Sequence, residues 1–309
     1  MDSKFMTYMV KRFLMAVLTV FLVVAITFFV MHAIPASPFS SEKAKSDATI
    51  AALEAKYGFD KPVPVQFVNY LKNILHGDFG LSTKWIGSTV AELIGGALPY
   101  SARLGLSAAS IAIFFGVCLG ALAALNRGNM VDKLVQVVTT GLVSMPNFVI
   151  ATLLLIVFAL KLGWLPTMAN QPGGMILPTI SLSLYPMAYI TRLERSSMLD
   201  VLGQDYIRTA RAKGVGNTGV IFKHALKNAC LPVVTYAGPM LAFIVTGSLV
   251  VEQIFAVPGI GRRFVSSIIN RDYTMIMGTT IFLAVLIIVM TLLCDIVYKL
   301  VDPRIDFDK

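Results

Sequence analysis

Six long apolar runs constrain this chain more than any other feature of its sequence. Each run holds few or no charged residues, and a helix needs about 20 such residues to cross a bilayer. In lipid the backbone must satisfy its own hydrogen bonds, so runs of this kind predict α-helices. The predicted spans are Phe13–Met31, Leu104–Leu125, Leu134–Leu160, Met175–Thr191, Leu231–Val251 and Thr274–Cys294. The predicted fold class is therefore an all-α membrane protein with six transmembrane helices.

The composition agrees with this class. Of the 309 residues, 56% are hydrophobic and 14% are charged, whereas soluble domains carry about 25% charged residues. The net charge of +9 could indicate nucleic-acid binding, but the lysines and arginines lie between apolar runs rather than in one soluble segment. Membrane topology explains this placement better than a nucleic-acid surface does.

The distribution of lysine and arginine also predicts an orientation. With the N-terminus inside, more than half of the 26 basic residues fall in inner segments, as the positive-inside rule expects. Both termini are then cytoplasmic, and residues 1–33 form an N-terminal tail with a retained first span. Residues 34–99 form an external loop. Residues 100–309 form the transmembrane core, which includes a cytoplasmic loop at residues 192–230.

The external loop is too long for a simple connection and is predicted to have structure of its own. Asp47 can cap a helix over ATIAALEAKY, and Pro64 can begin a second helix over VQFVNYLKNIL. Six lysines balance six acidic residues, so the surface is nearly neutral. Two roles stay open at this point: a resting surface for a soluble outer partner, or a shield for the helix bundle.

A basic segment, Asp205–Pro232, lies between the fourth and fifth predicted spans. Drawn as a helix, Ile207, Ala210 and Gly214 share a narrow face. Gly214 can end this helix in the left-handed conformation, and Asn217 can cap a second helix. The second helix has an apolar stripe of Ile221, Phe222, Ala225, Leu226 and Ala229. Basic residues on the other side are Arg208, Arg211, Lys213, Lys223 and Lys227. Two readings compete: a plain basic loop, or a surface that another protein contacts.

Two spans contain polar, helix-weakening interruptions. One is Ser144-Met145-Pro146-Asn147 in the third span, and the other is Thr246-Gly247-Ser248 in the fifth. Such breaks line a cavity or mark a bend, although threonine and serine can also bond back to the preceding helical turn. The residues predicted to face a translocation path are Asn147, Phe243, Thr246, Gly247 and Ser248.

The chain carries none of the usual signs of catalysis. No histidine, aspartate or glutamate lies inside a predicted span, whereas ion-coupled transport places ionisable residues at that depth. No phosphate-binding G-x-x-x-x-G-K-[ST] loop is present either. We therefore expect no catalytic residue, no metal and no cofactor on this chain. If ATP drives its action, another chain must bind the nucleotide.

Three sequence blocks resemble the permease subunits of ATP-binding-cassette (ABC) importers, in the oligopeptide/dipeptide permease family. They are AKYGFDKPVPVQFVNYLKNILHGDFG in the external loop, R-T-A-R-A-K-G with H-A-L-K-N-A-x-L-P in the basic loop, and Thr-Gly-Ser-x-Val-x-Glu followed by Pro-Gly-Ile-Gly. These blocks are most similar to the oligopeptide-permease B-type subunit. Against the general importer pattern E-A-A-x3-G-x9-I-x-L-P, Gly214 and Leu226 are in register. The departures are Arg208, Thr209, His224 and Lys227, for Glu, the first Ala, Ile and Pro.

The resemblance implies a type I ABC importer permease fold in a bacterial cytoplasmic (inner) membrane. It implies half of a pore for oligopeptides, completed by a homologous second permease subunit. An external peptide-binding protein and two ATPase subunits, which use ATP and Mg²⁺, would complete the assembly. The basic loop would then hold the coupling helices that dock on an ATPase. The implied coupling residues are Arg208, Ala210, Arg211, Lys213, Gly214 and Val215.

Other functions remain open on the sequence. Import of dipeptides, nickel chelates or glutathione would use the same architecture. An ion-coupled secondary transporter would also explain six spans, but not the paired helices of the basic loop.

Overall fold

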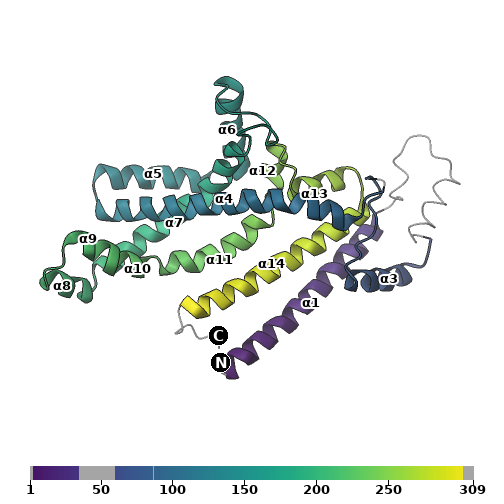
Figure 1. Ribbon diagram of the computed structural model, residues 1–309, viewed down its shortest axis with the longest axis horizontal. Coiled ribbons are helices and arrows are strands. Elements are labelled where there is room, and N and C mark those ends of the chain that lie inside the picture. Colours follow the sequence, from purple (N-terminus) through teal and green to yellow (C-terminus); the bar gives the residue numbers. More distant parts are fainter. Residues whose placement is uncertain (1–2, 35–59, 86, 302–309) are drawn as a thin grey trace. The chain divides into compact units, whose positions relative to one another are not determined.

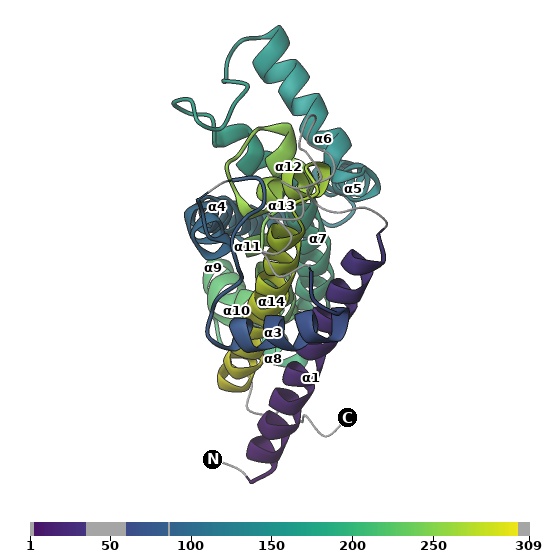
Figure 2. The ribbon, with the colours of Figure 1, turned by 90° about the vertical axis from the view of Figure 1, so that its right-hand side faces the viewer.

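The computed structural model describes residues 3–34, 60–85 and 87–301. Within these ranges the regular structure is helical, and the only β-type pairing is one isolated bridge between Leu81 and Thr89. Figures 1 and 2 show the helices from two sides. The chain divides into two compact units. The first unit is Met1–Pro99, Arg262–Val289 and Lys299–Lys309, and the second is Tyr100–Gly261 and Met290–Tyr298. The helix predicted over ATIAALEAKY lies outside the described residues.

The helices follow one another closely along the chain. In order they are α1 (Ser3–Ala33), α3 (Val63–Leu75), α4 (Val90–Leu125), α5 (Met130–Ser144), α6 (Asn147–Leu154), the π-helix η1 (Leu155–Lys161), α7 (Ile176–Leu202), α8 (Asp205–Ala212), α9 (Asn217–Gly219), the π-helix η2 (Val220–Ala225), α10 (Leu226–Ala229), α11 (Leu231–Val245), α12 (Leu249–Ile254), α13 (Ile260–Ile269) and α14 (Tyr273–Val301).

Four helical segments of the described chain are long and apolar enough to cross a membrane: Val10–Ala33, Val90–Leu125, Leu231–Ile254 and Tyr273–Ile296. A fifth crossing is possible if α5 with the α6–η1 segment counts as one broken span, bent by 106°. The bend falls at the predicted interruption, where Met145 is extended before Pro146, as residues before proline prefer. Six spans are therefore not established by length and composition.

The fourth predicted span, Met175–Thr191, lies in α7, which is long enough but less apolar than the others. Its burial explains the difference. Buried positions recur along α7 and include polar ones such as Thr179, Ser181 and Ser183. A helix enclosed by protein needs less apolar surface than one that faces lipid.

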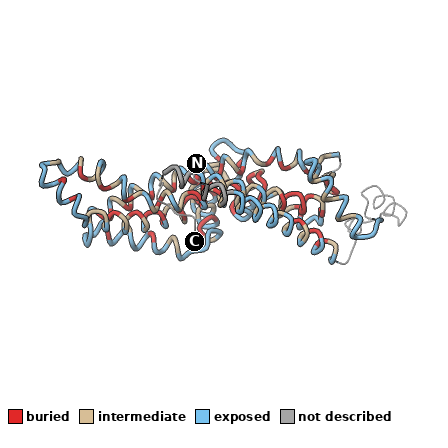
Figure 3. The backbone as a smooth tube through the Cα atoms, turned by 90° about the horizontal axis from the view of Figure 1, so that it is seen from below, coloured by how far each residue is buried: buried red, intermediate tan, exposed pale blue. Residues whose placement is uncertain are grey.

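Helix α7 is the centre of the second unit. It lies against α5, α6, α10, α11 and α12, and α4 approaches it at two glycines. A Cβ on Gly116 would lie 2.7 Å from a side-chain atom of Ile190, and one on Gly120 would lie 2.6 Å from the carbonyl oxygen of Thr191. These glycines let the two helices pack closely. Figure 3 shows buried positions alternating with exposed ones along the helices of the chain.

Helix α4 begins earlier than the sequence analysis assumed. Thr89 and Glu92 form a reciprocal cap: the Thr89 N–H donates to Glu92 Oε2 at 3.0 Å, and the Glu92 N–H donates to Thr89 Oγ1 at 3.1 Å. This T-x-x-E signature starts a helix at Val90, and Pro99 lies inside it. The proposed boundary between residues 99 and 100 therefore falls within a continuous helix.

The first unit is held together by aromatic and polar contacts near the end of α1. Phe28 and Met31 of α1 form a buried cluster with Tyr273, Ile276 and Met277 of α14. Phe67 and Tyr70 of α3 pack on the same cluster, so α3 lies beside α1 (Figure 2).

A buried carboxylate holds the chain before α4 in the first unit. Asp272 is fully buried, and it accepts hydrogen bonds from the hydroxyls of Ser82 and Thr83. These bonds fasten residues before α4 to the start of α14.

Candidate functional site

The basic loop folds as a helix, a glycine turn and a further helical segment, as the sequence predicts. Gly214 has φ +80°, and its N–H donates to the carbonyl of Arg211 at 3.0 Å while the Val215 N–H donates to that of Ala210 at 3.2 Å. This pair of bonds is the Schellman arrangement, which satisfies the last carbonyls of α8. Asn217 does not cap the next helix. Gly216 occupies that position, and Asn217 is already the first helical residue.

Two residues of the narrow face of α8, Ile207 and Ala210, pack against this chain, whereas Gly214 is exposed. Ile207 is fully buried and Ala210 is 7% exposed. Both pack in one cluster with residues of α7, η2 and α10: Met198, Val220, Ala225 and Ala229. This chain covers most of the Ala210 side chain, and a contact of Ala210 with another protein stays a prediction. The small residue lets α8 lie close to the underlying helices.

The outer side of α8 is basic and open. Arg208, Arg211, Lys213 and Gly214 are exposed, and Val215 is half-buried. Arg208 makes an ion pair with Asp205 at 3.6 Å, but both side chains are almost fully exposed, so the pair holds them weakly. No atom lies within 4 Å of a Cβ built on Gly214. These residues form an exposed basic surface on a packed base, which we call the basic surface.

The second half of the loop departs from its predicted stripe. Val220–Ala225 is a π-helix, whose wider turn shifts the register of the following side chains relative to an α-helix. Val220, Ala225 and Ala229 are buried, whereas Phe222 is 65% exposed. Phe222 was predicted to be in the apolar stripe and instead adds an exposed aromatic ring to the loop surface.

Hydrogen bonds of two side chains, Asn228 and Arg195, connect the helices in and beneath the loop. The amide of Asn228 donates to the Tyr206 hydroxyl at 2.9 Å, which connects α10 to α8. In α7, Arg195 makes two hydrogen bonds to Asp132 of α5, at 2.6 and 2.8 Å. Bidentate pairs of this kind fix geometry as well as charge, so α5, α7 and the loop form one packed body.

Glu194 lies buried where α7 meets the end of the loop. Its side chain is 0% exposed, and neither carboxyl oxygen has a hydrogen bond that satisfies normal geometry in the described chain. Burial raises the pKa of Glu194 to about 7, and the neighbouring Cys230 thiol opposes that shift. Burial and the adjacent Glu194 raise the pKa of Cys230 to about 12. A thiol that stays protonated lies beside a carboxyl group that titrates near neutrality.

The predicted path residues lie at two breaks in the second unit. Asn147 is exposed at the start of α6, and Phe243 is 65% exposed on α11. The Thr246 hydroxyl is buried and donates to the Phe243 carbonyl at 2.7 Å, which is the local alternative considered above. Ser248 accepts from the Val251 N–H at 3.3 Å and so caps α12. Gly247, with φ +99°, makes the turn between α11 and α12.

A buried joint beside this turn was not predicted from the sequence. Glu252 is fully buried in α12 and accepts a 2.7 Å hydrogen bond from Ser101 of α4. Ser101 in turn accepts from the Ile260 N–H at 2.8 Å. A Cβ on Gly259 would collide with both side chains. A glutamate flanked by Gly247, Gly259 and Gly261 could have signalled a crowded buried carboxylate, but nothing local in the sequence identified Ser101 as its partner.

Comparison with known proteins gives two matching families and a set of full-length relatives. Residues 116–307 match the family described as binding-protein-dependent transport system inner membrane component, and residues 5–91 match the N-terminal region of such membrane components. The chain is 45% identical to the dipeptide transport system permease protein DppB of Bacillus subtilis (strain 168), covering 98% of each chain. It is 42% identical to the oligopeptide transport system permease protein OppB of Salmonella typhimurium, covering 97% of this chain and 99% of the relative.

Solved structures give the fold. An inward-facing structure of the MetNI methionine ABC transporter contains a chain that aligns with TM-score 0.57 and 17% identity, over 68% of this chain and 96% of that one. A chain of an amino acid ABC transporter crystallised with histidines aligns with TM-score 0.53 and 18% identity, over 69% and 94%. At this identity the likeness concerns the fold alone, which the chain shares with these chains of ABC transporters.

Proposed function

The chain belongs to the family of binding-protein-dependent transport system inner membrane components, and from this membership we propose that it forms half of the pore of an ATP-driven peptide importer. It is the membrane-spanning permease subunit of an ABC importer, since its full-length relatives are oligopeptide and dipeptide permease proteins. We assign it oligopeptides as cargo, delivered by an external binding protein.

The observation that carries the coupling role is the basic surface on its packed base. Helix α8 buries Ile207 and Ala210 in the chain and leaves Arg208, Arg211 and Lys213 exposed. A force applied to such a surface moves the underlying helices with it, because the buried cluster joins α8 to α7 and α10. We propose that an ATPase subunit docks here. Gly214, Val215 and the exposed ring of Phe222 would supply the apolar part of the contact.

In the proposed assembly, partner subunits bind the nucleotide and complete the pore. With no phosphate-binding loop present, ATP and Mg²⁺ would be bound by two partner ATPase subunits. A homologous second permease subunit would complete the pore, and this chain would have no catalytic role.

The proposed topology has six spans in a bacterial inner membrane, with both termini cytoplasmic. The α5 and α6–η1 pair would count as one broken span, and α7 would cross as a helix shielded by its neighbours. Asn147, Phe243, Thr246, Gly247 and Ser248 would lie along the path. Exposure of Asn147 and Phe243 supports that placement more strongly than the locally bonded Thr246 and Ser248 do.

Uptake by the reconstituted complex tests the proposal. The chain is placed in proteoliposomes with its second permease, ATPases and binding protein, and uptake of labelled peptides of two to five residues is measured. We expect uptake to require ATP and to be unchanged when an uncoupler collapses the proton gradient; the reverse pattern would contradict an ABC importer. Dipeptide import is the second candidate, because of the 45% identity to a dipeptide permease. Uptake limited to two-residue peptides would favour it over oligopeptides.

A further inference from the structure

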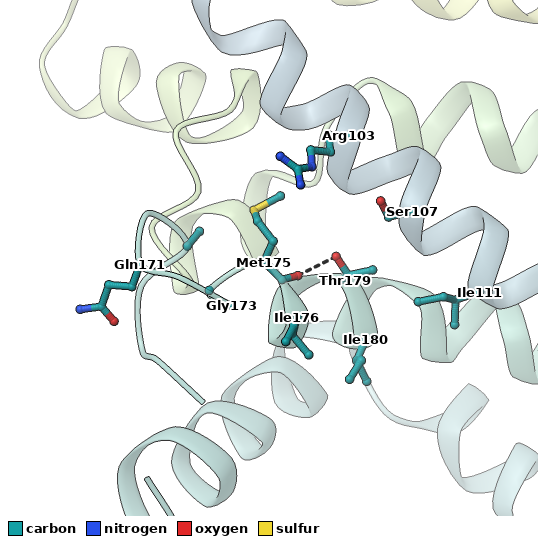
Figure 4. A pocket seen from close by; sticks show the side chains of 11 residues that line it. Arg103, Ser107, Ile111, Gln171, Gly173, Met175, Ile176, Thr179 and Ile180 are labelled. Carbon is teal, nitrogen blue, oxygen red and sulfur yellow. Dashed lines mark hydrogen bonds between the residues drawn. The ribbon is translucent and has the colours of Figure 1, made fainter. Parts of the chain in front are cut away.

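A cavity of about 610 Å³ lies in the second unit, between α4 and the start of α7. Arg103, Ser107 and Ile111 line it from α4, and several residues between Ala169 and Ile180 complete the lining (Figure 4). Its volume falls within the ~300–1,000 Å³ range of small-molecule sites. In the proposed topology this end of α4 faces the outer side, so the cavity lies where a released peptide would enter.

Among the residues that the structure describes, Arg103 is the only charged one that lines the cavity. Its side chain is exposed, and within residues 3–34, 60–85 and 87–301 it makes no hydrogen bond or ion pair. Figure 4 shows the guanidinium extending from α4 toward Met175, across the cavity from Thr179. The predicted second span begins at the next residue, Leu104, and continues without charge to Leu125. A cation at this position is costly next to lipid unless it faces water or an anion.

The remaining lining divides into an apolar and a polar part. Ile111, Ile176 and Ile180 supply apolar surface, while Ser107, Gln171 and the backbone at Gly173 supply polar groups. Gly173 has φ +78° and no side chain to cover its peptide groups. Such a lining suits a ligand with one negative group, an apolar side chain and amide groups.

We propose that this cavity binds the C-terminal end of the transported peptide. Arg103 is the counterion of the terminal carboxylate, and the isoleucines contact the last side chain. The proposal rests on the proposed function, because it names the substrate group that the permease itself recognises. Guanidinium and carboxylate have matching fork geometries, which makes this pair both specific and strong.

A peptide fits the cavity better than the phosphate of an anionic lipid. Lipid tails need continuous apolar surface, whereas Ser107, Gln171 and the exposed backbone at Gly173 interrupt it. A peptide has amide groups to pair with these positions. Binding of a lipid headgroup is therefore treated as an outcome that would overturn the proposal.

The test compares two peptides that differ only in the C-terminal group, a free carboxylate and an amide, in the complete reconstituted transporter. In the wild type we expect the amide to have a KM for uptake about tenfold higher, as for loss of one charge-assisted hydrogen bond. In Arg103→Ala the ratio of the two KM values should fall from its wild-type value to the part that the binding protein contributes, and Arg103→Lys should keep an intermediate ratio. The binding protein is the same throughout, so its own preference cancels when variants are compared.

Lys161→Ala is the matched control, since Lys161 is exposed at the end of η1 and does not line the cavity. It should keep the full wild-type preference. If the ratio of the two KM values in Arg103→Ala equals the wild-type ratio, the proposal is overturned. So does an equal loss for both peptides that follows the anionic lipid content of the vesicles, which would indicate a lipid site. Absence of any ATP-dependent peptide uptake in the wild type would instead contradict the proposed function itself.

Discussion

Two buried glutamates of the second unit, Glu252 and Glu194, have opposite surroundings. Both side chains are 0% exposed. Glu252 accepts a hydrogen bond from Ser101 and is enclosed by glycines, whereas neither oxygen of Glu194 has a well-formed hydrogen bond in the described chain. A buried carboxylate is tolerable when it is paired, and otherwise it takes up a proton. The first region is thus a polar joint, and the second contains a group that titrates.

This difference separates two mechanical roles. The Glu252 joint connects α4 to α12 and to the start of α13, so it fixes the backbone around the Thr246–Ser248 break. Glu194 lies on α7 next to Cys230, at the junction between the loop and α11. We therefore expect substitution of Glu252 to weaken the joint, and we expect the stability of the Glu194 region to depend on pH.

The largest expected effect is at the joint. Glu252→Ala removes a buried acceptor and leaves a cavity, so we expect a loss of about 3 kcal/mol in the free energy of unfolding. Thermal unfolding in detergent, followed by size-exclusion chromatography, measures it. Glu252→Gln is the matched control, because its amide oxygen can still accept from Ser101 and should cost less. Equal unfolding temperatures for Glu252→Ala and the wild type would show that the joint does not stabilise the unit.

Local sequence signals predicted several of the helices and the turns between them. The apolar runs located α1, α4, α11 and α14, and the Pro146 interruption located the bend after α5. Glycine chemistry located the turn at Gly214, whose φ is positive. These features depend on residues within one or two helical turns of one another, which is the range over which sequence patterns are informative.

Contacts between distant residues were beyond such signals. Ser101 and Glu252 are 151 positions apart, and no spacing rule connects them. The inward orientation of Ala210 depends on the residues that α7 and α10 place beneath it. The π-helix at Val220–Ala225 shifts the positions of the side chains relative to an α-helix, and Phe222 is exposed as a result. The capping pair Thr89 and Glu92 was readable from the sequence, and it would have corrected the start of α4.

An intermediate effect is expected at the glycine turn of the basic surface. Gly214→Val places a β-branched residue at φ +80°, at a cost of about 1–2 kcal/mol, without a clash inside this chain. In the reconstituted complex, the added bulk should abolish stimulation of ATP hydrolysis by peptide-loaded binding protein. ATPase activity with and without that protein is the measurement.

Gly216→Val provides the control for this turn, because Gly216 has φ −60° and open space around its Cβ position. Gly216→Val should fold without backbone strain. A loss of ATPase stimulation in both variants would therefore come from the bulk of the added side chain. If Gly214→Val reaches the membrane at normal levels and retains full stimulation, the ATPase does not dock on this part of the loop.

The smallest effect, a change in pH dependence, tests Glu194 directly. Its pKa is raised from 4.5 to about 7 in the folded chain, so between these values the folded state keeps a proton that the unfolded chain releases. Stability should therefore fall as the pH rises through this window and level off above it. Cys230 stays protonated throughout, since its pKa is about 12.

Glu194→Gln should flatten the decline of stability between pH 5 and 8. Asp200→Asn, at an exposed position of α7, is the control and should preserve the decline. Unfolding temperatures measured across this range provide the test. An unchanged slope in Glu194→Gln would mean that Glu194 does not hold the expected proton in the folded protein.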